Sequence, residues 1–260
     1  MISGAGLSVR PEASRRRYLE THVALFQSFW FGDVVPLCQT LCMKSFVDRG
    51  HEYDLYSYSE QVVPKGVRQQ DANQILPRDD VFFYRRGEGA GSVAGFANKF
   101  RYRLLMLRGG WWVDTDVLCL SSTEPKGDTF FAREDEHRIG SAILKFPRNN
   151  STICALYEES LRAGKDLFWT QTGPLLITTL AMEAGLWGRA EVPNIAYPIH
   201  YNDWLLPVQA ATQAAAQENI RSASFLHLWN EAFRRGNSLA LDSPEPGSLL
   251  ADFYEKHDVR

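Results

Sequence analysis

The alternation of apolar and polar positions predicts a chain that opens with a strand, a helix and a second strand. Residues 22–31 are apolar and aromatic, as expected of a buried strand. A helix should follow between Asp33, which can cap it, and Gly50, which can end it, with Pro36 in its first turn. Residues 52–58 alternate and are rich in tyrosine, which indicates the second strand. This opening is typical of α/β folds with a parallel sheet.

The middle of the chain is predicted to contain loops and one long helix. Residues 60–80 are polar and should form loops or short turns, and residues 81–84 a short strand. The glycine-rich segment 85–92 should be a mobile loop that closes over a ligand. Ser92 can cap a helix that runs to about Arg108, where Gly109 and Gly110 stop it.

The second half of the chain shows strands and helices in alternation. Strands are expected at 111–113, 117–120, 129–134, 140–146, 194–201 and 224–229, and helices at 151–163 and 173–185. Residues 209–217 favour a helix, and the segment after 236 is loop-like. The pattern therefore predicts one α/β domain over residues 21–236. A tail precedes it at 1–20, and a tail or peripheral helix follows at 237–260.

Composition excludes several classes of function. The chain has 260 residues, 45% of them hydrophobic, which suffices for a core without disulfides. The formal net charge of -3 gives no indication of a nucleic-acid partner. No signal peptide or membrane-length apolar segment is visible, so the sequence predicts a cytoplasmic protein with four free cysteine thiols. Arg15–Arg17 should be solvated; peripheral membrane contact is the alternative.

Two aspartates stand out in the segment GGWWVDTDVLCL. Carboxylates among apolar residues are costly unless they are neutralised. On a regular strand Asp114 and Asp116 would face the same side and repel each other unless a cation lay between them. Mn²⁺ and Mg²⁺ take oxygen ligands and often join protein carboxylates to substrate phosphates. The pattern predicts a divalent metal that holds a phosphate-bearing substrate, with an exposed surface turn as the alternative.

The longer segment FANKFRYRLLMLRGGWWVDTDVLCL resembles the DxD-containing sugar-binding region of retaining glycosyltransferases. That group includes α-1,4-galactosyltransferases and initiating mannosyltransferases, with the glucosyltransferase domains of large clostridial toxins as distant relatives. Weaker matches extend the resemblance over most of residues 22–235. It implies a GT-A fold, a nucleotide-sugar-binding α/β sandwich with a mostly parallel central sheet.

The resemblance also implies an activity. A metal-dependent retaining hexosyltransferase would move a hexose from a nucleotide-diphosphate sugar, UDP-linked, to a glycan such as a bacterial surface polysaccharide. A protein acceptor is the alternative. Mn²⁺ or Mg²⁺ is the implied cofactor.

The resemblance assigns roles to residues of the long motif. Asp116 matches the aspartate that binds the metal directly. Asp114 matches the one that contacts the donor sugar or ribose, or the metal through water. Asn98 and Arg101 match the D-x-x-R positions that contact the donor, with Asn in place of Asp. Asp114, Asp116 and Arg101 are thus the expected catalytic residues.

Three further residues outside the long motif match positions of the family. Trp30 corresponds to an aromatic residue near the nucleotide base, with plain core packing as the alternative. In the segment FLHLWNEAF, His227 would be the third metal ligand and Trp229 would contact the diphosphate through its indole N–H. His200 competes with His227 for the metal.

Two other functions remain open at this point. The segment VDTDVL imitates the D-x-D-x-[TV] motif of haloacid-dehalogenase-type phosphatases, in which Asp114 would be the nucleophile and Asp116 the acid/base. The second alternative is a catalytically inactive protein that binds a sugar nucleotide, which the Asn at position 98 keeps open.

Overall fold

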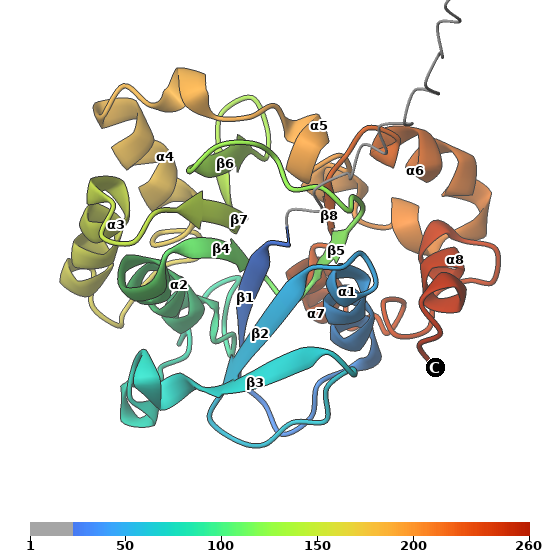
Figure 1. The fold of residues 1–260 in the computed structure, drawn as a ribbon, viewed down its shortest axis with the longest axis horizontal. Coiled ribbons are helices and arrows are strands. Elements are labelled where there is room, and N and C mark those ends of the chain that lie inside the picture. The colour runs from blue at the N-terminus through green and yellow to red at the C-terminus, as the bar shows by residue number, and fades with distance from the viewer. Residues whose placement is uncertain (1–22) are drawn as a thin grey trace, which may run out of the picture.

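The computed structural model describes residues 23–260 (Figure 1). The predicted N-terminal tail at 1–20, with Arg15–Arg17, lies outside the described residues. Within them, eight strands form two sheets. The strands are β1 (Leu25–Trp30), β2 (Glu52–Ser57), β3 (Val67–Asp71), β4 (Gly110–Val113), β5 (Val117–Cys119), β6 (Phe130–Arg133), β7 (Ile139–Phe146) and β8 (Phe225–His227).

The larger sheet confirms the predicted α/β architecture with a mostly parallel centre. Its order is β3-β2-β1-β4-β7-β6. β3, β2, β1 and β4 run parallel, whereas β7 is antiparallel to both of its neighbours, β4 and β6. β5 and β8 form a separate antiparallel pair.

Helices lie on both faces of the larger sheet (Figure 1). The α-helices are α1 (Leu37–Val47), α2 (Ala94–Arg108), α3 (Ser151–Arg162), α4 (Pro174–Glu183), α5 (Pro193–Ala196), α6 (Gln213–Ile220), α7 (Asn230–Arg235) and α8 (Leu249–Lys256). Short 3-10 helices connect them at Ala72–Gln74, Arg78–Asp80, Trp187–Arg189, Tyr201–Asp203, Leu206–Val208 and Ala210–Thr212. None of the helices within 23–260 combines the length and apolarity that crossing a membrane requires.

The two tryptophans of β4 divide the core between the faces of the sheet. Trp112 packs in the apolar cluster that includes α2, α3 and α4, and Trp111 in the cluster that includes α1, β5 and β8. Both are 1% exposed, as expected where successive strand side chains point to opposite sides of a sheet that is covered twice. The strand that leads to the two aspartates is therefore held firmly in the centre of the molecule.

A third apolar cluster joins the C-terminal part to α1. It contains Leu41 of α1, Leu118 of β5, Leu226 of β8 and Leu250 of α8. The segment after 236, expected to be loop-like, thus contains a packed helix. Ser248 caps α8 by accepting a hydrogen bond from the Ala251 N–H.

Several predicted elements differ from the structure. Residues 60–80 contain the strand β3, and its sequence VRQQD gave no signal because an edge strand with exposed side chains needs no apolar alternation. Residues 81–84 form no strand. Residues 194–201 are predicted to be a strand, but Pro193 starts the short helix α5, which ends at Ala196, and irregular chain leads from there to a 3-10 turn at Tyr201.

Two predicted caps are also wrong in detail. Asp33 does not cap α1, which begins after Pro36 without a side-chain cap. The Ser92 hydroxyl accepts a hydrogen bond from the Ala94 N–H, but the capping position of α2 is Val93. Gly109 ends α2 as expected, at a φ of 68°.

Candidate active site

The two aspartates lie in the turn that connects the two sheets. β4 ends at Val113 in the larger sheet, and β5 begins at Val117 in the smaller one. Asp114 and Asp116 therefore lie between two strands, as the predicted strands at 111–113 and 117–120 had implied, and not on one regular strand. β1 has β2 on one side and β4 on the other, so the turn follows the carboxyl end of a strand where the strand order reverses. Open α/β sheets bind ligands at this place.

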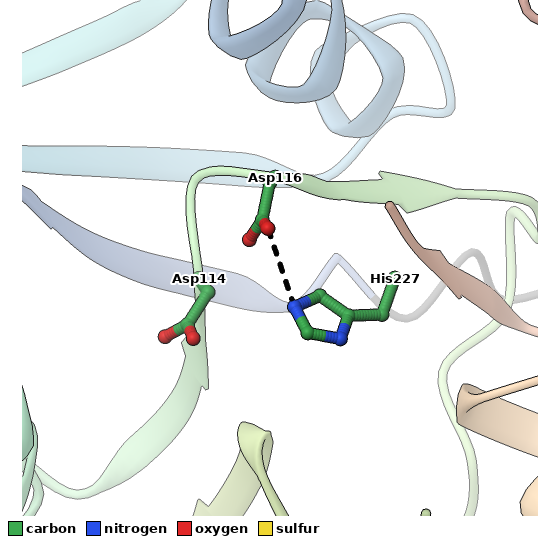
Figure 2. A group of neighbouring side chains, drawn as sticks. All are labelled: Asp114, Asp116 and His227. Atoms are coloured by element: carbon green, nitrogen blue, oxygen red, sulfur yellow. Dashed lines mark ion pairs between the residues drawn. The ribbon is translucent and has the colours of Figure 1, made fainter. Parts of the chain in front are cut away.

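Asp116 and His227 form a buried pair. In the smaller sheet, Val117 is paired with His227, which brings the imidazole beside the turn. His227 Nε2 lies 3.3 Å from Asp116 Oδ2, as the dashed line in Figure 2 marks. The same carboxylate oxygen accepts a hydrogen bond of 2.8 Å from the Asn230 N–H. The pairing of β5 with β8 thus joins residues that are far apart in the sequence.

Asp114 is held by different partners. Its Oδ1 accepts hydrogen bonds of 2.7 Å from the Arg101 guanidinium and 2.7 Å from the Trp112 indole N–H. The Arg101 side chain is 4% exposed and also donates to the Ser141 carbonyl. A buried guanidinium with two fixed partners is not a solvated helix charge, so Arg101 belongs to the site.

The charges of the site follow from these contacts. Burial raises the pKa of Asp114, and the nearby Arg101 does not fully offset it. Burial also acts upward on Asp116, but His227 and the Asn230 N–H bring its pKa below the ordinary value. Burial acts downward on His227, yet Asp116 and Asp114 raise its pKa. A positive charge beside the Asp116 carboxylate is therefore favoured.

The donor set fits a divalent cation. One ligand atom from each of Asp114, Asp116 and His227 lies within 4.8 Å of the others, and no other such group was found within residues 23–260. Two carboxylates and an imidazole suit Mn²⁺, and Mg²⁺ less well because of the nitrogen. His227 Nε2 faces the Asp116 carboxylate, whereas its buried Nδ1 has no hydrogen-bond partner among those residues, so a cation bound at Nε2 would take the place of the Nε2 proton. His200 lies outside the group, and its Nδ1 accepts a hydrogen bond from the Asn202 N–H.

A cavity of about 1120 Å³ opens beside this cluster. All seven site residues predicted from the sequence line it: Trp30, Asn98, Arg101, Asp114, Asp116, His227 and Trp229. The volume is that of a large small-molecule site. The structure thus places all the predicted residues in the wall of one cavity, although it does not test the role of each residue.

Trp30 and Asn98 lie in different parts of the cavity wall. Trp30 ends β1, and its buried indole N–H has no acceptor among residues 23–260. Asn98 is 6% exposed, and its amide donates to the Thr172 hydroxyl over 3.4 Å. Its amide lies against Gly173, where an added Cβ would come within 3.0 Å of Nδ2.

Trp229 has an unusual backbone conformation. Its φ of 55° is rare for a bulky residue and is found where the surroundings impose it, often at functional sites. The indole N–H donates to the Ile199 carbonyl at 2.9 Å, so in this conformation it is not free for a diphosphate. The ring lies 4.2 Å from that of His227.

Two features of the cavity escaped the sequence analysis. Glu134, in the turn between β6 and β7, is 8% exposed, and burial raises its pKa although Arg138 lies 3.3 Å away. The other is the aromatic pair Phe168 and Trp169 before α4. The acidic segment 133–137 can be read from the sequence. Only the β6–β7 hairpin shows that Glu134 is the carboxylate of this segment that lines the cavity.

No protein-family model matches the chain, and no curated protein matches it. Solved structures with a similar fold include the PaToxG glycosyltransferase, at 12% identity and a TM-score of 0.47, over 85% of this chain and 86% of that one. Another is the apo structure of the bifunctional glycosyltransferase WbbM, at 11% identity and a TM-score of 0.43, over 96% of this chain and 53% of that one. Similarity at this level assigns neither a family nor a function to the chain.

Proposed function

We propose that this protein is a metal-dependent retaining glycosyltransferase of GT-A fold that transfers a hexose from a UDP-sugar to a glycan. The observation that carries the proposal is the Asp114–Asp116–His227 group, at the carboxyl end of β4 and inside a cavity large enough for a nucleotide sugar. Buried Arg101, fixed on Asp114, supports it. A glycan is the proposed acceptor, with a protein as the alternative, and the proposed location is the bacterial cytoplasm.

The Asp–Asp–His group would hold Mn²⁺ or Mg²⁺, with Asp116 and His227 as direct ligands. When bound, the cation supplies electrostatic stabilisation for the negative charge that develops on the departing diphosphate. Trp229 stands next to His227 and would add its indole N–H to the same charge after releasing the Ile199 carbonyl.

The remaining residues would bind and orient the donor. Arg101 and Trp112 both occupy Oδ1 of Asp114, which fixes the carboxylate and leaves Oδ2 for a sugar or ribose hydroxyl. Asn98 would accept a hydrogen bond from one sugar hydroxyl and donate a hydrogen bond to another. Trp30 would stack on the nucleotide base. We name no protein base, because in a retaining transfer the departing phosphate can itself take the acceptor proton.

The phosphatase alternative is less well supported by the same geometry. A nucleophilic Asp114 would have to attack phosphorus while two donors hold one of its oxygens, and Asp116 is paired with His227 rather than placed as a free acid. An inactive protein that binds a sugar nucleotide would need the same binding site as the enzyme. Only a measurement of transferase or hydrolase activity can therefore separate these two alternatives.

A thermal-shift panel of UDP-, GDP- and other nucleotide sugars, each with and without Mn²⁺, tests the proposal. We expect the melting temperature to rise only when Mn²⁺ and a UDP-sugar are both present, since ligands that bind the native state stabilise it. Slow release of free hexose from that UDP-sugar, followed by NMR, would separate an enzyme from an inactive binder. The absence of any shift, with hydrolysis of a phosphate ester in Mg²⁺, would favour the phosphatase.

A further inference from the structure

An exposed phenylalanine outside the proposed metal group lines the same cavity. Phe168 belongs to the connection between α3 and α4 and is 58% exposed, although it lines the cavity. Its neighbour Leu167 is 4% exposed and anchors the connection in the core. A singly exposed apolar side chain is ordinary on a protein surface, but this ring lines the cavity, where its uncovered apolar face can contact a ligand.

The backbone around Phe168 is fixed, so the exposure of the ring is built into the turn. The Phe168 N–H donates to the Gln171 side-chain oxygen at 3.1 Å, and the Gln171 N–H donates back to the Phe168 carbonyl at 3.2 Å. Thr170, between them, has a φ of 70°, which is uncommon for a β-branched residue. The turn therefore fixes the backbone position of Phe168, with Thr170 in a strained conformation.

Trp169, the next residue of the turn, packs against neighbouring side chains and backbone. Its ring lies 5.3 Å from that of Tyr84, and the Arg235 guanidinium stands 5.8 Å from its ring centre. Gly89 approaches it so closely that an added Cβ would be 2.4 Å from the tryptophan ring. Trp169 is thus half-buried against these neighbours, whereas Phe168 is exposed.

The surroundings of Phe168 favour a sugar over a hydrocarbon. Arg86 and Asp166 also line the cavity, form an exposed ion pair of 3.0 Å and offer charged hydrogen-bonding groups. A sugar ring has an apolar face of C–H groups that packs on an aromatic ring, and hydroxyls that bond to such charged groups. A lipid chain would leave the ion pair without hydrogen-bonding partners from the ligand.

The turn also lies on the appropriate side of the cavity. It ends at Gly173, which packs against Asn98, the proposed donor-sugar contact, whereas Trp30 at the proposed base position ends β1. A ligand on Phe168 would therefore extend from the sugar end of the donor.

We propose that Phe168 is the stacking platform of a saccharide-binding subsite, with Arg86 and Asp166 as its polar partners. Its use as the acceptor subsite rests on the glycosyltransferase function proposed above, but saccharide binding itself does not require nucleotide or metal.

Saturation-transfer NMR with a panel of methyl glycosides of glucose, galactose, mannose and N-acetylglucosamine, without nucleotide or metal, tests the subsite. We expect at least one glycoside to bind the wild type. Phe168→Ala should weaken that binding by about two- to tenfold, because it removes the ring on which the sugar stacks. Phe168→Tyr should keep the binding and Phe168→Leu should not. Leu161→Ala, an exposed change on α3 outside the cavity, is the matched control.

Three results would overturn the subsite: no glycoside binds the wild type, Phe168→Ala binds as well as wild type, or Phe168→Leu binds as well as Phe168→Tyr. The last result would assign the ring to an apolar partner. The UDP–Mn²⁺ shift of the wild type is recorded separately. If glycosides bound in a Phe168-dependent way but UDP and Mn²⁺ did not raise the melting temperature, the saccharide subsite would stand and the proposed glycosyltransferase function would be rejected.

Discussion

Asp114 and Asp116 show how two identical side chains acquire opposite properties two positions apart. Burial dominates at Asp114 and raises its pKa, although Arg101 is in contact. At Asp116 the imidazole of His227 and a backbone N–H outweigh burial and lower the pKa. Asp116 is therefore the carboxylate held ready as an anion, which is what a direct metal ligand must be.

Replacing Asp116 by Asn tests this assignment. Asp116→Asn should abolish Mn²⁺-dependent stabilisation by UDP, because the amide removes the charge while keeping nearly the same shape. Calorimetric titration with Mn²⁺ and UDP measures the loss, and circular dichroism checks the fold. Asp128→Asn, at an exposed position outside the cavity, should bind as the wild type does. Normal Mn²⁺ binding by Asp116→Asn would remove Asp116 from the metal site.

Glu134 gives a pH-dependent prediction. Burial raises its folded-state pKa above the unfolded value, so its stabilising effect is complete below the unfolded pKa and is lost as pH rises through the folded pKa. Glu134→Gln resembles the protonated form. Its melting temperature relative to wild type should therefore increase between about pH 4 and about pH 8.

Thermal melts of wild type and Glu134→Gln across that range measure the effect. Glu255→Gln, on the exposed face of α8, should show no such trend. A difference between Glu134→Gln and wild type that stayed constant with pH would mean that Glu134 titrates normally.

At the scale of elements, the apolar pattern of the sequence predicted most of the core strands and helices. It did not predict elements that form only because they pair with a neighbouring strand. β1, β2, the hairpin of β6 and β7, and the long helix α2 all appear at their expected positions. β3 could not be seen, because its residues are polar and its partner β2 alone makes it a strand. The proximity of His227 to Asp116 came from a resemblance; physically it depends on the β5–β8 register, which no local pattern encodes.

The α2–β4 junction carries a prediction of its own. Gly109 has a φ of 68°, and an added Cβ would lie 2.5 Å from the Arg148 backbone nitrogen. Its ψ of -166° places Gly109 in a region that essentially only glycine adopts, so Gly109→Ala should destabilise the protein by more than the strain alone, which is about 1–3 kcal/mol there. Gly164→Ala is the control, because Gly164 has a φ of 74° with open space around it. Equal urea midpoints for the two variants would mean that the contact with Arg148 relaxes freely.

At the scale of the whole molecule, the C-terminal part is packed against the rest. Leu250 of α8 is fully buried, and His257 Nδ1 lies 2.7 Å from Asp48 Oδ2 beyond the end of α1. The sequence described residues 237–260 as a tail or peripheral helix, since a short amphipathic segment gives no indication of what covers it.

Removing residues 237–260 should therefore lower the melting temperature strongly and expose the third cluster. Leu250→Ala, a point change in the same contact, should cost about 2–5 kcal/mol. Urea denaturation measures both variants. A truncated chain as stable as the full one would show that α8 is peripheral after all.

The β5–β8 pairing has a consequence for how the molecule moves. Two of the proposed ligands lie at the same end of this short pair, and Leu118 and Leu226 of the same strands pack in the cluster with α8. A bound cation would therefore oppose the separation of β8 from β5, and opening that pair would release the cation. Chelation should then accelerate amide hydrogen exchange in β8 and α8 while β1 and β2 remain protected. The concentration of free metal would then set the fraction of time for which β8 and α8 stay packed on β5.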